Sequence, residues 1–113
     1  MEVKLGNWSP WRPFPDPRLG DALVAPIGPG VYDLRLRSTK ELILFGSGGH
    51  LAKRMTSLLP VPFGTGTRNN AKKRECVLGE LADLEYRTVA FASKAEAKAF
   101  EKTLRRSGYR YPT

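Results

Sequence analysis

The chain has 113 residues, of which 41% are hydrophobic and 27% charged, and its formal net charge is +8. This length and composition favour one globular domain and exclude a disordered or low-complexity chain. A single cysteine, Cys76, excludes an internal disulfide, and together with the single histidine it excludes a tetrahedral Cys/His zinc site. No apolar run approaches the ~18 residues of a membrane span, and the first residues lack the pattern of a secretory signal. We therefore expect a soluble, cytoplasmic protein that does not bind membranes.

Residues 1–29 predict an N-terminal arm. They hold six of the nine prolines, which excludes a long helix or a central strand. Trp8, Trp11 and Phe14 lie among these prolines, and a disordered tail seldom carries three large aromatic residues. We expect an extended arm that packs its aromatic side chains on the domain. The alternative is a strip that binds a protein partner.

The next residues predict a β-hairpin. Residues 31–37 alternate between an apolar face and a mainly polar face that carries Asp33 and Arg35, a pattern typical of a half-buried strand. Residues 38–40 form a short turn. Residues 42–45 are a continuous apolar run, which is typical of a strand buried on both faces.

Two helices and a third strand follow. A glycine-rich turn leads to a helix with its apolar face at Leu51, Met55 and Leu58, ended by Pro60 and Pro62. After a loop, a second helix is predicted over about 70–81, and a strand over 86–92. The inward residues of that second helix are Cys76, Val77 and Leu81.

The last helix has the clearest signals. Ser93 and Glu96 have the spacing of a capping box, and Gly108 ends the helix. Its apolar face consists of Ala97, Phe100 and Leu104. The order β-β-α-α-β-α predicts an α/β fold: a small three-layer sandwich with a central, mostly antiparallel three-stranded sheet flanked by helices.

The positive charge is concentrated after the arm. Residues 1–29 contain three basic and three acidic residues, so the whole excess lies in residues 30–113. Two stretches, 42–74 and 102–113, contain no acidic residue. Such stretches favour binding to nucleic acid phosphates, and the alternative is a basic surface that serves only solubility. The candidate nucleic-acid-binding residues in these stretches are Lys53, Arg68, Lys72, Lys73, Arg74, Arg105 and Arg106.

Four short motifs stand out in residues 30–113. They are Gly30-Val31-Tyr32, Leu44-Phe45-Gly46, Leu51-x-x-Arg54 and Glu96-Ala97-x-x-x-Glu101. In this order and with this spacing they resemble the motifs of the GIY-YIG nuclease superfamily. The resemblance implies an endonuclease that hydrolyses phosphodiester bonds in DNA with Mg²⁺ or Mn²⁺ as cofactor. We expect a monomer or weak dimer.

The resemblance also implies roles for individual residues. Tyr32 would act as the base or proton relay for the attacking water, Arg54 as the phosphate clamp, and Glu101 as the metal ligand. Helical geometry is compatible with this, since Arg54 and Glu101 each border the packed face of their helix. His50, close to the start of the first helix, is a further candidate for proton transfer.

The sequence departs from the family pattern at two positions. Leu44 replaces the second family tyrosine, and Thr113 lies where the closing asparagine of the family would fall. A leucine cannot hydrogen-bond as a phenol does. A second hypothesis is therefore a catalytically degenerate nucleic-acid-binding module on the same fold. A third is an interaction protein whose arm binds a partner.

Overall fold

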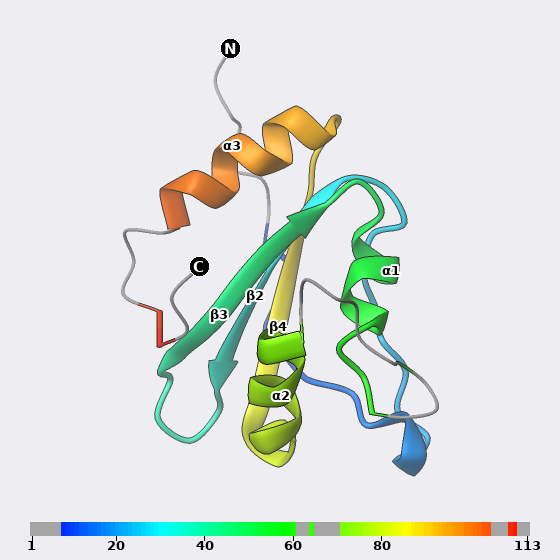
Figure 1. Cartoon of the computed structure of the whole chain (residues 1–113), viewed down its shortest axis with the longest axis vertical. Helices are drawn as coiled ribbons and strands as arrows, with labels where there is room; N and C mark the ends of the chain where they lie inside the picture. The colour runs from blue at the N-terminus through cyan, green and yellow to red at the C-terminus, as the bar shows by residue number, and fades with distance from the viewer. Residues whose placement is uncertain (1–7, 61–63, 65–70, 105–108, 111–113) are drawn as a thin grey trace.

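A four-stranded antiparallel sheet forms the centre of the computed structural model, which describes residues 8–60, 64, 71–104 and 109–110 (Figure 1). The strands are β1 (Arg12–Pro13), β2 (Gly30–Leu36), β3 (Leu42–Gly48) and β4 (Leu84–Ala90). Their spatial order is β1-β4-β2-β3, so β3 is an edge strand. The helices are α1 (Leu51–Thr56), α2 (Ala71–Gly79) and α3 (Lys94–Leu104), with short 3-10 turns η1 (Pro17–Leu19) and η2 (Leu81–Asp83).

The helices pack on opposite faces of the sheet. Successive residues of a strand point to opposite sides, so a strand can supply apolar side chains to both faces. In Figure 1, α3 lies on one side of the β3 ribbon, and α1 and α2 lie on the other. The α3 face has a small apolar core of Val31, Val89, Ala97 and Phe100. The larger core includes Tyr32, Leu34, Leu44, Leu51, Met55, Val77 and Tyr86. The predicted α/β class and the order β-β-α-α-β-α are confirmed.

The sheet has one strand more than predicted. β1 comes from the arm and pairs antiparallel with β4, opposite Tyr86 and Glu85. Backbone hydrogen bonds on either side continue this pairing, from Ser9 N to Thr88 O and from Phe14 N to Leu84 O, both 2.8 Å. A two-residue edge strand that contains a proline has no periodicity, so the sequence pattern did not indicate it.

The aromatic residues of the arm lie against the sheet and α3. The Trp8 ring centroid is 5.6 Å from that of Phe100. The Arg87 guanidinium carbon lies 4.1 Å from the Trp8 ring centroid and 4.6 Å from that of Trp11. Phe14 is buried and meets Tyr86 edge to face.

These contacts bury β2 more completely than the sequence predicts. The strand was predicted to be half-buried, with Asp33 on its polar face, but Asp33 is 0% exposed. Its carboxylate accepts hydrogen bonds from Arg87 Nε at 3.0 Å and from the Tyr109 hydroxyl at 2.8 Å. Burial raises the pKa of Asp33, and the bonds from Tyr109 and Arg87 oppose that rise. The half-buried prediction was wrong because the arm and Tyr109 contribute to covering this face.

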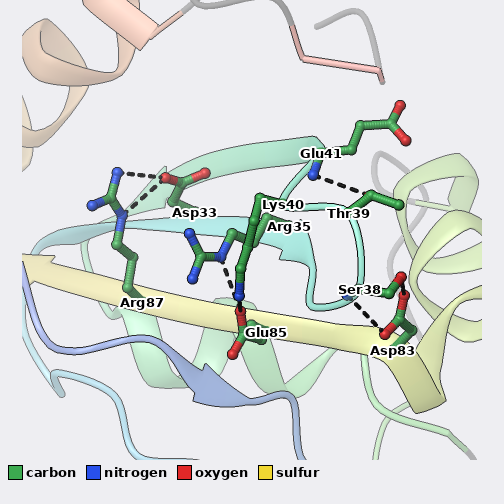
Figure 2. A network of polar contacts seen from close by, with 9 residues as sticks. All are labelled: Asp33, Arg35, Ser38, Thr39, Lys40, Glu41, Asp83, Glu85 and Arg87. Carbon is green, nitrogen blue, oxygen red and sulfur yellow. Dashed lines mark hydrogen bonds and ion pairs between the residues drawn. The ribbon is translucent and has the colours of Figure 1, made fainter.

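Ion pairs between neighbouring strands match the register of the sheet. Asp33 lies directly opposite Arg87, and Arg35 directly opposite Glu85. Figure 2 shows both pairs, with Arg35 Nε 2.9 Å from Glu85 Oε1. Opposite charges at such positions stabilise a pairing, and a shift of one residue would move each of them to the other face.

Several element boundaries differ from the sequence prediction. β4 begins and ends two residues earlier, at Leu84 and Ala90, because its pairing with β2 continues to Leu36. α1 ends at Thr56, yet Leu58 is buried just beyond it. The predicted end of the last helix at Gly108 lies outside the described residues. Among the described helices, none is long and apolar enough to cross a membrane.

Candidate active site

A hollow of about 260 Å³ is lined by residues from two strands and all three labelled α-helices. Its lining residues are Tyr32, Gly46, Ser47, Arg54, Lys73, Lys94, Lys98 and Glu101. Tyr32, Arg54 and Glu101 were singled out by the motif resemblance and lie far apart in the sequence. The fold brings all three to the same hollow.

Tyr32 forms a largely buried wall of this hollow. The residue is only 2% exposed and lies opposite Gly46 in the β2–β3 pairing. A Cβ atom on Gly46 would lie 2.5 Å from Tyr32 Oη, so the position requires glycine for steric reasons. Burial has the largest effect and raises the pKa of the Tyr32 phenol. The positive charge of Arg54 lowers this pKa, and the negative charge of Glu101 raises it. The phenol is therefore protonated at neutral pH.

Glu101 reaches the hollow from α3. The start of α3 is held by the predicted cap, in which Ser93 Oγ accepts a hydrogen bond from Glu96 N at 3.2 Å. Across the hollow, the Ser47 hydroxyl donates to Glu101 Oε2. Ser47 was not recognised from the sequence, although it directly follows the motif glycine on β3 and pairs with Val31. The hydrogen bond from Ser47 to one carboxylate oxygen fixes the orientation of the Glu101 side chain.

Arg54 reaches the hollow from α1. Its side chain lies along Gly48, where an added Cβ would be 3.4 Å from Arg54 Nε. Arg54 also borders a second hollow of about 320 Å³, which contains His50 and Lys53.

His50 has a structural role that the sequence did not suggest. Its Nδ1 accepts a hydrogen bond from Lys53 N at 3.1 Å and so caps α1. The structure places His50 in the second hollow and not among the residues that line the first. Its assignment to proton transfer stays a prediction.

Lysines from two helices surround the hollow. Lys73 comes from α2, and Lys94 and Lys98 come from α3. The latter two were not among the sequence candidates. A helical projection of residues 94, 98 and 101 would have found them, because these positions fall on one helical face.

The other basic candidates take different positions. Lys53 and Lys72 are exposed. Arg74 instead points inward, and its Nη2 donates to Leu59 O and Gly64 O, both at 3.0 Å. Arg68, Arg105 and Arg106 lie outside the described residues.

Replacing Arg74 with alanine should mainly destabilise the fold. The change removes two hydrogen bonds from a charged donor to partly buried carbonyl oxygens, a loss of about 2–3 kcal/mol in the free energy of unfolding. Thermal unfolding would measure it, with Lys72→Ala on the same helix as the exposed control. Equal melting temperatures for the two variants would contradict this role.

The donor set fits a magnesium ion that keeps most of its water ligands. Mg²⁺ binds carboxylate oxygens and retains several waters, so one carboxylate facing an open hollow can hold it. Within the described ranges, no group of three or more His, Cys, Asp or Glu side chains is gathered that could form an all-protein cage. Glu101 is the acidic residue that lines the hollow.

The second family tyrosine has no counterpart on β3. Leu44 is 0% exposed and belongs to the larger apolar core, so its side chain contributes to packing and not to the hollow. A larger tyrosine at this position would have to displace its neighbours. Thr113 lies outside the described residues.

The whole fold resembles a solved nuclease domain. It is similar to the crystal structure of the GIY-YIG N-terminal endonuclease domain of UvrC from Thermotoga maritima, bound to its catalytic divalent cation, magnesium. The two chains are 27% identical with a TM-score of 0.55, over 80% of this chain and 85% of that one. No family model matches the chain, and no curated protein matches its sequence. The similarity confirms the resemblance indicated by the four motifs: the chain has the GIY-YIG fold.

Proposed function

We propose that this protein is a metal-dependent endonuclease that hydrolyses phosphodiester bonds in DNA. The observation that carries the proposal is the convergence of Tyr32, Arg54 and Glu101 on one hollow, from three different elements. Each side chain has the chemistry that the resemblance requires at its position. The similarity to a magnesium-bound endonuclease domain supports both the nuclease activity and the divalent cation.

The residues of the hollow divide the chemistry of hydrolysis among them. The planar Arg54 guanidinium pairs with the oxygens of the scissile phosphate and stabilises the charge that develops on them. Tyr32 Oη would hold the attacking water by a hydrogen bond, and because the phenol is protonated, it would accept the proton of the water while passing its own proton to an oxygen of the scissile phosphate. A divalent cation bound by the Glu101 carboxylate would supply positive charge at the leaving oxygen.

The basic side chains around the hollow suit a nucleic acid backbone. Lys94, Lys98 and Arg54 line the hollow itself, and Lys53 on α1 and Lys72 on α2 are exposed. We propose that these residues bind phosphates of DNA through charge and without reading base sequence.

One observation favours a second function on the same fold. Leu44 occupies the position of a family tyrosine and is buried in the core. A protein that lacks the second phenol could bind nucleic acid through its basic surface without cleaving it.

A plasmid-nicking assay distinguishes the two functions. The purified chain should convert supercoiled plasmid to open circles when Mg²⁺ or Mn²⁺ is present, and chelation of the metal with EDTA should stop the reaction. Salt-dependent binding of DNA without nicking in either metal would support the binding module and overturn the nuclease.

A further inference from the structure

Three consecutive basic residues of α2 take three different positions. Lys72 is exposed, and Arg74 donates to backbone carbonyls of the preceding segment. Lys73, between them, is partly buried and lines the hollow together with Tyr32. In the sequence the three residues form a single basic run, so their separation is a result of the tertiary structure.

Lys73 is held in the hollow by the backbone of a motif residue. Its Nζ donates a hydrogen bond to Phe45 O at 3.1 Å. Phe45 lies in the Leu44-Phe45-Gly46 motif on β3, and an edge strand leaves backbone groups available to side chains. This bond positions the ammonium at the hollow.

The position of Lys73 matters because of what the hollow lacks. Leu44 brings no phenol to it, and the described residues of α2 contribute Lys73 alone to its lining. Among the described lining residues, Tyr32 is the only one that carries a phenol. A lysine ammonium that lines the same hollow as Tyr32 adds a strong hydrogen-bond donor where negative charge would develop on a bound phosphate.

We propose that Lys73 is a catalytic residue, whose ammonium donates to an oxygen of the scissile phosphodiester and stabilises the charge that develops during cleavage. This role rests on the proposed nuclease function. It differs from the surface contact predicted for Lys73 from the sequence, because a surface contact contributes to affinity whereas a transition-state contact contributes to the rate.

Alanine and arginine substitutions test this role. Lys73→Ala should lower kcat for plasmid nicking about 10²-fold, with little change in KM, as for other removed transition-state donors. Lys73→Arg keeps the charge and should recover part of the rate. Lys72→Ala removes the neighbouring charge and should raise KM for DNA without a comparable loss of kcat. Lys102→Ala, on an exposed position of α3, is the control for a general loss of charge.

A second measurement reports the contact without turnover. In NMR spectra of lysine ammonium groups, the Lys73 signal is assigned by its absence in Lys73→Arg. Adding a short DNA duplex in metal-free buffer should shift this signal. Thermal unfolding of each variant shows whether a loss of rate comes from a loss of folded protein.

The outcomes separate the two proposals. If the native chain nicks DNA and Lys73→Ala does so at the rate of Lys102→Ala, the role of Lys73 is overturned and the nuclease function stands. If the native chain does not nick DNA, the nuclease function and the catalytic role both fail. A Lys73 signal that shifts in that case identifies it as a phosphate contact of a binding module.

Discussion

Glu101→Gln is expected to abolish metal-dependent cleavage while DNA affinity is retained. The amide has nearly the shape of the carboxylate but lacks the charge that binds the cation. Metal ions contribute several kcal/mol to such reactions, and each 1.4 kcal/mol is tenfold in rate, so the expected loss is about 10³-fold or more. The variant should fold normally, because the amide oxygen can still accept the hydrogen bond from Ser47.

Affinity should not suffer, because Glu101 is the acidic residue among cations. Arg54, Lys94 and Lys98 line the same hollow, and removing a negative charge beside them favours an anionic ligand. Fluorescence anisotropy with a DNA duplex in metal-free buffer would measure this. A rise in dissociation constant that matched the loss of rate would argue against a role confined to the metal.

Glu96→Gln is the matched control on the same helix. Glu96 belongs to the cap of α3, where its carboxylate accepts from Ser93 Oγ at 3.4 Å, and it does not line the hollow. This variant should nick plasmid at the native rate. Nicking by Glu101→Gln at the rate of Glu96→Gln would mean that the metal ligand is assigned wrongly.

Arg54→Ala is expected to lower kcat by about 10²–10³-fold, the loss typical of removing one preorganised donor to a developing charge. The guanidinium lies in the hollow beside Tyr32 and lowers the pKa of that phenol. Its removal therefore takes away both the phosphate clamp and the positive charge that favours deprotonation of Tyr32. Single-turnover cleavage at saturating DNA would measure the loss.

Arg54→Lys separates charge from geometry. Lysine keeps the positive charge but cannot pair with phosphate through two parallel bonds, so only part of the rate should return. Lys53→Ala, the adjacent exposed residue on α1, should instead raise KM. A full recovery of rate in Arg54→Lys would show that charge alone matters at this position.

Much of the candidate site could be recognised from the sequence because short motifs encode local geometry. The alternating residues 31–37 and the apolar run 42–45 predicted a hairpin, and its register places Tyr32 opposite Gly46. The steric need for glycine there follows from the phenol that lies against it. The capping box at Ser93 likewise located the start of the helix that carries Glu101. Each of these signals depends on residues a few positions apart along the chain.

Charge patterns along the chain were less informative about the surface. The stretch 102–113 contains no acidic residue, yet Arg110 pairs with Glu41 at 2.6 Å and with Glu80 at 3.2 Å. Arg74 likewise forms hydrogen bonds inside the fold, to the carbonyl oxygens of Leu59 and Gly64. Net charge is additive along a sequence, but the partner of each charge depends on which distant segments become neighbours.

The sequence by itself determined the α/β class and the order of the main elements, and it singled out Tyr32, Arg54 and Glu101 as candidates. Only the tertiary structure decided that the arm supplies a fourth strand, that Asp33 is buried, and that Ser47 and Lys73 belong to the same hollow as Glu101. The physical reason is that periodicity, capping and turn signals are local, and they depend on residues within one element. Burial and hydrogen bonding at these positions depend on contacts between segments more than 25 residues apart, such as Ser47 with Glu101 and Phe45 with Lys73.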